Sequence, residues 1–185
     1  MGVDPAFGSD SLFAIVITQK RNGIIEVIHS EEFPGMDHDQ MCKMIVNMMA
    51  RHNISKVYVD SQMQSVIDKV KAMTGDAEYE GKRVAMPLRE IPYSKYKIYG
   101  VNFGRYGLEM IQHSQRIFSE GIIAIDETKH SNLLQQLRTA TLINQNGRRP
   151  ELDKDHYGTM DTYDAFNLSL INYTFKDISD PYARV

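Results

Sequence analysis

The stretch SLFAIVITQKRNGIIEVIH, residues 11–29, determines the fold. Its first part, residues 11–18, is rich in β-branched and aromatic residues, which predicts a buried strand. Asn22-Gly23 is typical of a tight hairpin turn, and residues 24–29 are then the returning strand. Gly2-Val3-Asp4-Pro5 resembles the end of a further strand. Because the chain begins almost at that strand, we expect the strand's upstream half to lie on a separate or removed segment.

Helices and strands alternate after the hairpin. Asp37 and Gln40 form a capping-box pattern at the start of a helix that should reach His52, with methionines repeating along its core face. Ser61 with Gln64 is expected to cap the next helix. Further strands are expected at residues 56–60, 84–88, 96–101 and 121–126, and further helices around residues 108–121, 133–140 and 159–175.

This order of elements predicts an α/β fold. An antiparallel meander followed by α/β units gives a mixed sheet with helices on its faces. We expect one domain over residues 1–176 and a flexible tail over residues 177–185. Residues 144–158 are polar and should form a loop or an exposed hairpin.

The composition excludes several classes of protein. The chain has 185 residues, of which 42% are hydrophobic and 24% charged, as in an ordinary globular domain. A single cysteine, Cys42, rules out an internal disulfide framework and a cysteine-rich zinc site. No secretory signal is visible, and no apolar run is long enough to predict a membrane span.

The charge is distributed unevenly along the chain. The total is −3, yet residues 82–149 carry 11 Lys and Arg against 5 Asp and Glu, a net charge of +6. The segments before and after them are acidic. Such a pattern suits a protein that holds cations in one place and a polyanion in another. Chance clustering of solvated charges gives the same pattern, so the charge distribution alone does not distinguish a binding function from chance.

Four aspartates adjoin apolar, core-facing segments, where burying a carboxylate without a cation costs free energy. Asp4 and Asp60 end apolar strands, and Asp161 and Asp164 continue the core-facing stripe of the last helix. The helix dipole offsets only about 0.3–1 kcal/mol of their repulsion. Bound divalent cations would neutralise the repulsion between these carboxylates, and Mg²⁺ and Mn²⁺ prefer such oxygen ligands. Taken singly, a strand end or a helix cap is the more ordinary explanation; their joint occurrence favours a metal site.

These residues resemble a known family. The segments Gly2-Val3-Asp4-Pro5-Ala6-Phe7-Gly8-Ser9-Asp10, Val57-Tyr58-Val59-Asp60 and Asp161-Thr162-Tyr163-Asp164-Ala165 resemble the nuclease domain of the viral terminase large subunit, the DNA-packaging motor of tailed viruses. The first segment, with Val101-Asn102-Phe103-Gly104, is most similar to terminases of archaeal viruses or proviruses. The resemblance implies a ribonuclease H-like fold and cleavage assisted by two Mg²⁺ or Mn²⁺ ions.

The resemblance assigns roles residue by residue. Asp4, Asp60 and Asp161 match the catalytic, metal-binding acids, and Asp164 matches a further metal ligand. The family often has two adjacent acids here, but Met160 precedes Asp161, so a second ion should be held less tightly. Candidates for water-holding or outer positions are Asp10, Asp155 and His156. The implied partners are double-stranded DNA, the terminase ATPase domain, the small subunit and the portal, in the cytoplasm of an infected or provirus-carrying host cell.

The basic middle segment offers phosphate contacts. Binding through such cations would be sensitive to salt and independent of sequence. The nearby tyrosines, including Tyr99 and Tyr106, are expected to pack against sheet edges rather than stack on bases. The candidate DNA-binding residues are Lys95, Lys97, Arg105, Arg148 and Arg149.

Other chemistries lack their motifs. The segment GDAEYEGKR, residues 75–83, has five residues between its glycines where an ATP-binding loop has four, and ends in Arg instead of Ser or Thr. No ATPase activity is therefore expected. A His-x-x-x-His zinc pattern and a serine nucleophile elbow are also absent from the sequence.

The sequence thus predicts a metal-dependent endonuclease that cuts double-stranded DNA with low sequence specificity during genome packaging. Two alternatives remain open. One is a Holliday-junction resolvase or transposase-like nuclease of the same fold. The other is a catalytically inactive docking module of the packaging motor.

Overall fold

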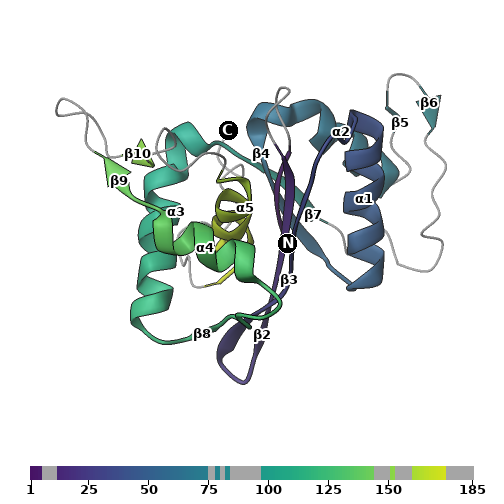
Figure 1. Ribbon diagram of the computed structural model, residues 1–185. Helices are drawn as coiled ribbons and strands as arrows, with labels where there is room; N and C mark the ends of the chain where they lie inside the picture. The colour runs from purple at the N-terminus through teal and green to yellow at the C-terminus, as the bar shows by residue number, and fades with distance from the viewer. Residues whose placement is uncertain are drawn as a thin grey trace.

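A mixed sheet lies between two layers of helices (Figure 1). The computed structural model describes residues 1–5, 12–74, 97–142 and 160–173 in full, and the backbone alone at 78–79, 82–83, 143 and 151–152. Six strands form the sheet in the order β7-β4-β1-β2-β3-β8. Their bounds are β1 Gly2–Asp4, β2 Phe13–Arg21, β3 Ile24–Phe33, β4 Lys56–Asp60, β7 Lys97–Val101 and β8 Ile123–Ala124.

The hairpin forms where the sequence predicts it. Asn22 and Gly23 both have positive φ, 50° and 84°, as a two-residue turn matched to the twist of the strands requires. β1 then pairs antiparallel with β2 on one side and parallel with β4 on the other. β4 pairs in parallel with β7, and β3 with β8. The predicted meander followed by parallel units is confirmed.

The central strands are buried on both faces because helices cover each one. Val3, Phe13 and Ile15 point to helices α1 (His38–Arg51) and α2 (Gln64–Met73). Alternate residues, including Ala14 and Val16, point to α3 (Phe103–Ser119), α4 (Ser131–Thr139) and α5 (Asp161–Leu170). Figure 1 shows α1 and α2 on one side of the sheet and α3, α4 and α5 on the other. The fold class is therefore as predicted.

The helix starts follow local hydrogen bonding, with one correction. Asp37 and Gln40 make the predicted capping box of α1. Ser61 and Gln64 do not cap the next helix, so that prediction is wrong. The Asp60 side chain accepts from the Gln62 amide, so a short 3₁₀ turn, η1 (Ser61–Met63), comes first and α2 begins without a side-chain cap.

Several boundaries differ from those predicted. β3 continues to Phe33, beyond the expected end at residue 29, while β8 keeps only two residues of the expected strand at 121–126. The last helix is shorter than the expected 159–175. β9 (Leu142–Ile143) pairs antiparallel with β10 (Glu151–Leu152), as the hairpin alternative for this region requires. A second short pair is β5 (Glu78–Tyr79) with β6 (Lys82–Arg83).

Some predictions fall outside the described residues, namely the strand at 84–88 and the tail at 177–185. The methionine stripe of α1 is core, as expected: Met41, Met48 and Met49 are buried. Within the described part of the chain, no helix combines the length and apolar character needed to cross a bilayer.

Candidate active site

Asp4 and Asp60 lie side by side at the ends of two parallel strands. Val3 pairs with Val59, so the next residue of each strand is an aspartate at the same edge of the sheet. Paired strands are about 4.8 Å apart, and the two aspartates directly follow the last pair, Val3 and Val59. Both aspartates are half-buried. The location is that of a ligand site in an open α/β sheet, beyond the carboxyl ends of parallel strands.

Helix α5 approaches this edge because Gly2 has no side chain. A Cβ placed at Gly2 would lie 1.9 Å from the carbonyl oxygen of Ala165 and 2.4 Å from the amide nitrogen of Ser169. The helix therefore packs directly on the backbone of β1. At its other end, the amide of Leu12 donates to Oδ2 of Asp161 at 3.2 Å.

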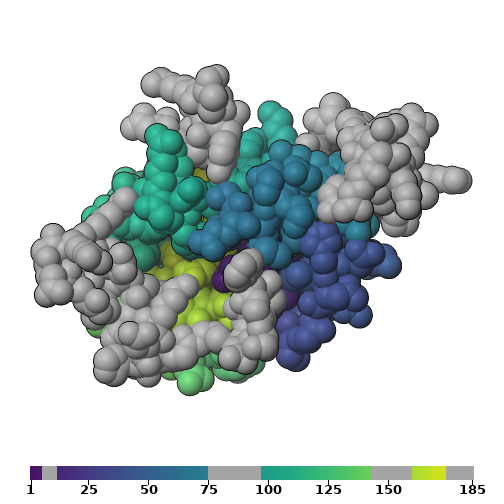
Figure 2. Space-filling model, turned by 90° about the horizontal axis from the view of Figure 1, so that it is seen from above, coloured from purple at the N-terminus to yellow at the C-terminus, as the bar shows by residue number. Residues whose placement is uncertain are grey.

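These two contacts align Asp161 with Asp4. From Ala165 back to Asp161 the helix rises about 6 Å, at 1.5 Å per residue. From Gly2 to Asp4 the strand extends about 6.6 Å in the same direction. The first turn of α5 thus reaches the same end of the sheet as Asp4 and Asp60. Figure 2 looks onto this end and shows α5, in yellow-green, at the surface beside a small purple area of the N-terminal segment.

A row of residues crosses the sheet at this level. Asp4 pairs with Ala14, and Ala14 pairs with Glu32 on β3. Directly paired residues point to the same face, which here is the face covered by α5, since Ala14 packs in the cluster with Ala165 and Phe166. Glu32 therefore lies on the α5 side, two strands from Asp4. Sequence reasoning missed it because the strand was expected to end at residue 29.

The two acids of α5 differ in exposure. Asp161 is half-buried, whereas Asp164 is only 8% exposed, and its amide bonds to the carbonyl of Met160. Met160, which stands where the resembling family often has an acid, is 1% exposed and packs with Ile111 and Tyr163. Burial, helped by the nearby Asp164 charge, raises the pKa of Tyr163, so its phenol stays neutral.

The carboxylates are held by backbone amides. Oδ1 of Asp60 accepts from the Gln62 amide at 3.1 Å, and Oδ2 of Asp161 accepts from Leu12. Among the described residues, no three His, Cys, Asp or Glu side chains lie close enough together to form a ready-made metal site. The donor set itself suits Mg²⁺ or Mn²⁺, because the acids brought to this end of the sheet offer hard oxygen atoms.

The predicted cationic residues are separated by the fold. Arg105 lies in the first turn of α3, just after Val101, which pairs with Asp60, so it is at the acidic end; its guanidinium lies 5.2 Å from the ring centre of Tyr106. Lys97 lies at the other end of β7, about 13 Å along the strand from Val101. The remaining candidates lie outside the described residues: Asp10, Lys95, Arg148, Arg149, Asp155 and His156.

Tyr99 and Tyr106 pack at the edge strand, as expected, whereas the other two tyrosines of that prediction, Tyr93 and Tyr96, lie outside the described residues. Tyr99 stacks on Tyr58 with ring centres 5.1 Å apart, and Tyr106 packs beside them with Phe103. Their rings cover the α5-facing side of β4 and β7. They support this edge of the sheet and are partly buried.

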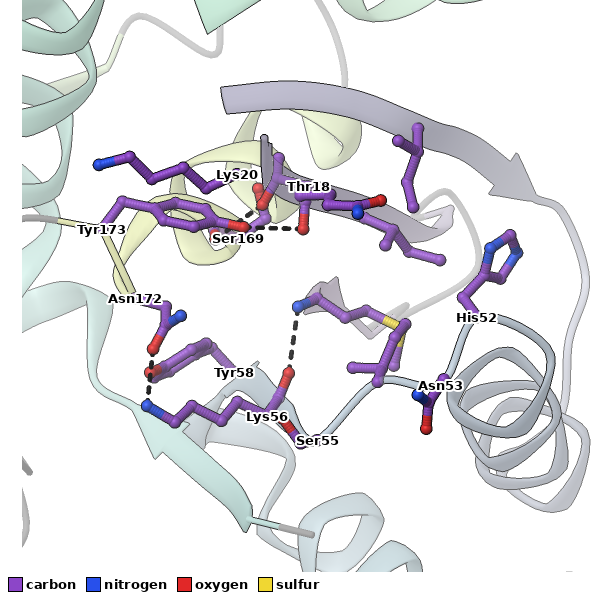
Figure 3. A pocket seen from close by; sticks show the side chains of 15 residues that line it. Thr18, Lys20, His52, Asn53, Ser55, Lys56, Tyr58, Ser169, Asn172 and Tyr173 are labelled. Atoms are coloured by element: carbon purple, nitrogen blue, oxygen red, sulfur yellow. Dashed lines mark hydrogen bonds between the residues drawn. The ribbon is translucent and has the colours of Figure 1, made fainter. Parts of the chain in front are cut away.

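A cavity of about 440 Å³ lies at the opposite end of the sheet (Figure 3). Several of its polar side chains are hydrogen-bonded: Lys56 donates to Asn172 at 2.8 Å, and the Tyr173 hydroxyl donates to the carbonyl of Thr18 at 2.8 Å. No carboxylate is among the described residues that line it. The cavity therefore does not offer the chemistry of the acidic end.

Comparison with known proteins gives a likeness of fold. No protein-family model and no curated protein match the sequence. The structure is similar to the large terminase nuclease of thermophilic phage G20c, with a TM-score of 0.65 and 11% identity over 91% of this chain and 78% of that chain. It is also similar to the large terminase nuclease domain of bacteriophage SPP1 with bound Mn, with a TM-score of 0.52 and 19% identity over 91% and 82% of the two chains.

A longer structure aligns as well. The large terminase of another thermophilic bacteriophage has a TM-score of 0.64 and 11% identity, and the aligned part covers 92% of this chain but 38% of that one. The chain thus has the fold of phage large terminase nucleases, and the resemblance expected from the sequence is confirmed at that level. These three neighbours are phage proteins; the archaeal placement stays a prediction.

Proposed function

We propose that this chain is the nuclease domain of a terminase-type packaging protein and hydrolyses phosphodiester bonds in double-stranded DNA with low sequence specificity. One observation carries the proposal: in the fold shared with phage terminase nucleases, β1, β4 and α5 bring Asp4, Asp60 and Asp161 to the same end of the sheet. The neighbour from SPP1 was crystallised with bound Mn, and one structure of the G20c nuclease holds magnesium.

Asp4, Asp60 and Asp161 would hold Mg²⁺ or Mn²⁺, with Asp164 as a further ligand. When bound, two such ions supply a nucleophilic hydroxide and stabilise the leaving oxygen. Two backbone amides of this chain would orient the carboxylates that hold the ions. The Gln62 amide orients the Asp60 carboxylate, and the Leu12 amide orients that of Asp161. Because buried Met160 cannot supply a carboxylate, the second ion should be the weaker one.

Arg105 is the described cation best placed to contact a DNA phosphate. It is exposed and stands at the acidic end, so it would draw the DNA backbone toward the carboxylates. Lys97 is farther away, on the edge strand, and would meet only a duplex that extends along that edge. Lys95, Arg148 and Arg149 remain sequence-based proposals, as do the outer roles of Asp10, Asp155 and His156.

The partners follow from the same proposal. The aligned part covers 38% of the longer phage terminase, so most of that protein has no counterpart in this chain. We propose the ATPase domain, the small subunit and the portal as partners, and the cytoplasm of an infected or provirus-carrying host cell as the place of action.

A second candidate is a catalytically inactive docking module. The observation in its favour is that the described acids do not form a ready-made metal site. An active site must then gain its geometry when the cations bind. Calorimetry with Mn²⁺ separates the two candidates, because an inactive module would show no binding at millimolar concentration.

Cleavage of supercoiled plasmid in Mn²⁺ tests the proposed activity. Asp60→Asn and Asp161→Asn should each abolish cutting while the protein stays folded, since the amide keeps the shape but loses the charge. Asp68→Asn is the matched control, because Asp68 is exposed on α2, on the opposite face of the sheet. Full cutting by either site variant would refute the assignment. Preference for branched over linear DNA would favour a junction resolvase.

A further inference from the structure

The first turn of α5 has no local cap, although its sequence begins with an acid. The preceding residue, Met160, makes no capping hydrogen bond with its side chain. The first backbone amides of a helix have no partner within the helix and must find one elsewhere. Here the Thr162 amide donates to Oε1 of Glu32 at 3.3 Å, and the Tyr163 amide donates to Oε1 of Gln136 at 2.8 Å. Side chains from β3 and α4 thus replace the cap.

These side chains form one connected network. Oε1 of Glu32 also accepts from the Thr162 hydroxyl and from Nε2 of Gln136, the latter at 2.7 Å. Thr162 is 1% exposed and Gln136 is 8% exposed, so the network is shielded from water at these two residues. A buried network whose members are satisfied rigidifies the elements that it joins. The elements here are β3, α4 and the start of α5.

Glu32 supplies a carboxylate to the exposed amide end of α5. A carboxylate is favourable beside the positive end of a helix, and the uncapped amides would otherwise compete for those of Asp161 and Asp164. The Asp161 carboxylate accepts from the Leu12 amide, which precedes β2. Thr162 directly follows Asp161, so the hydrogen bonds from Thr162 to Glu32 fix the backbone next to Asp161.

From this geometry we infer that Glu32 is a positioning residue: through Thr162 and Gln136 it fixes the first turn of α5 so that Asp161 and Asp164 face the carboxyl ends of β1 and β4. The inference rests on the proposed function, since it concerns the same acidic site. The role inferred for Glu32 is positioning, since its Oε1 accepts two hydrogen bonds from Thr162 and one from Gln136.

Two substitutions separate positioning from charge. Glu32→Gln keeps an oxygen that can accept from Thr162, whereas Glu32→Ala removes it. The control is Glu31→Ala, because Glu31 is exposed, precedes Glu32 on the same strand and therefore points to the opposite face. Mn²⁺ binding is measured by calorimetry without DNA, and circular dichroism during heating confirms that each variant is folded.

Glu32→Ala should weaken Mn²⁺ binding about tenfold, the lower end of what loss of a supporting residue costs a metal site. Glu32→Gln should restore binding to within about threefold of the unaltered protein, since hydrogen bonding to the ligand-bearing segment is kept. The control should bind Mn²⁺ as the unaltered protein does. If Glu32→Ala does not fold, Thr162→Val removes the hydroxyl donor at similar volume and should also weaken binding.

The outcomes separate the two claims. Unchanged Mn²⁺ affinity in folded Glu32→Ala, or in Thr162→Val where that variant replaces it, would overturn the positioning role while the proposed function stands, provided that Asp161→Asn loses binding. An unaltered protein that binds no Mn²⁺ would overturn the proposed function, and the positioning role with it.

Discussion

The backbone amide of Leu12 donates a 3.2 Å hydrogen bond to Oδ2 of Asp161, 149 residues later in the chain. It joins the approach to β2 with the first turn of α5. Together with the packing of Ala165 on Gly2, it sets the helix antiparallel to β1. This arrangement brings an acid from the end of the sequence to the edge that carries Asp4 and Asp60.

Gly2→Ala should destabilise the protein strongly. The new methyl group would lie 1.9 Å from the carbonyl oxygen of Ala165, so α5 would have to move away from β1. Overpacking of this kind costs about 1–3 kcal/mol and sometimes more. Urea unfolding followed by circular dichroism measures the loss in the free energy of unfolding.

The matched control is Gly107→Ala in α3. Among the described residues, and apart from the backbone of α3 itself, a Cβ at Gly107 would meet one atom within 4 Å, Cδ1 of Phe103 at 4.0 Å. Alanine favours a helix over glycine by about 0.8–1 kcal/mol, so this variant should be more stable. A Gly2→Ala protein as stable as the unaltered one would show that α5 does not pack on β1 as closely as described.

Arg105→Gln should weaken DNA binding and reduce its dependence on salt. Removing one phosphate contact lowers the slope of log affinity against log salt concentration by about 0.9 for duplex DNA. The measurement is fluorescence anisotropy with a labelled duplex, in Ca²⁺ to avoid cutting, over a range of NaCl concentrations.

Arg51→Gln provides the comparison for that experiment. It removes the same charge from the exposed last turn of α1, next to His52, which lines the cavity at the other end of the sheet. Its salt slope should stay near that of the unaltered protein. Equal slopes for all three proteins would exclude Arg105 from the DNA contact.

Stability should fall as the pH drops from 7 toward 5. Burial lowers the pKa of several histidines, so the folded state holds them neutral below the pH at which the unfolded chain takes up protons. Their contribution is complete above the unfolded pKa of about 6.5 and is lost below it. These histidines are His29, His52, His113 and His130.

His113 allows a specific test of that effect. Its Nε2 lies 3.3 Å from the carbonyl oxygen of Leu170, which ties α3 to the end of α5. His113→Gln keeps a donor group but cannot titrate, so it should flatten the dependence of the unfolding free energy on pH. Urea unfolding at pH 7.5 and 5.5 gives the two values. The same pH dependence with and without His113 would contradict this account.

Much of the fold could be predicted because its signals are local. The β-branched run of β2, the Asn22-Gly23 turn and the capping box at Asp37 each act within a few residues. Asp4 and Asp60 could be placed for the same reason, since an acid directly after an apolar run marks a strand end. The order of elements then predicted the mixed sheet.

The rest depends on contacts between distant residues. Because Ser30, Glu31 and Glu32 are polar, the sequence does not indicate that β3 continues through them. This part of β3 forms because β2 is long enough to pair with it, beyond a register shift between Ile17 and Thr18. The cap of α5 by Glu32 and Gln136 joins β3, α4 and α5, and no local sequence pattern predicts it. Lys97 was predicted as a DNA contact, but its distance from the acidic end could not be predicted because the irregular sequence around β7 does not show the direction of that strand.

The central claim is that Asp4, Asp60 and Asp161 converge to hold divalent cations at the carboxyl ends of β1 and β4. The most direct test is a crystal of the protein soaked in Mn²⁺ and measured for anomalous scattering. The account predicts Mn²⁺ bound by these carboxylates between β1 and the start of α5. Well-ordered carboxylates at this edge without Mn²⁺, or with Asp161 turned away from Asp4 and Asp60, would contradict it.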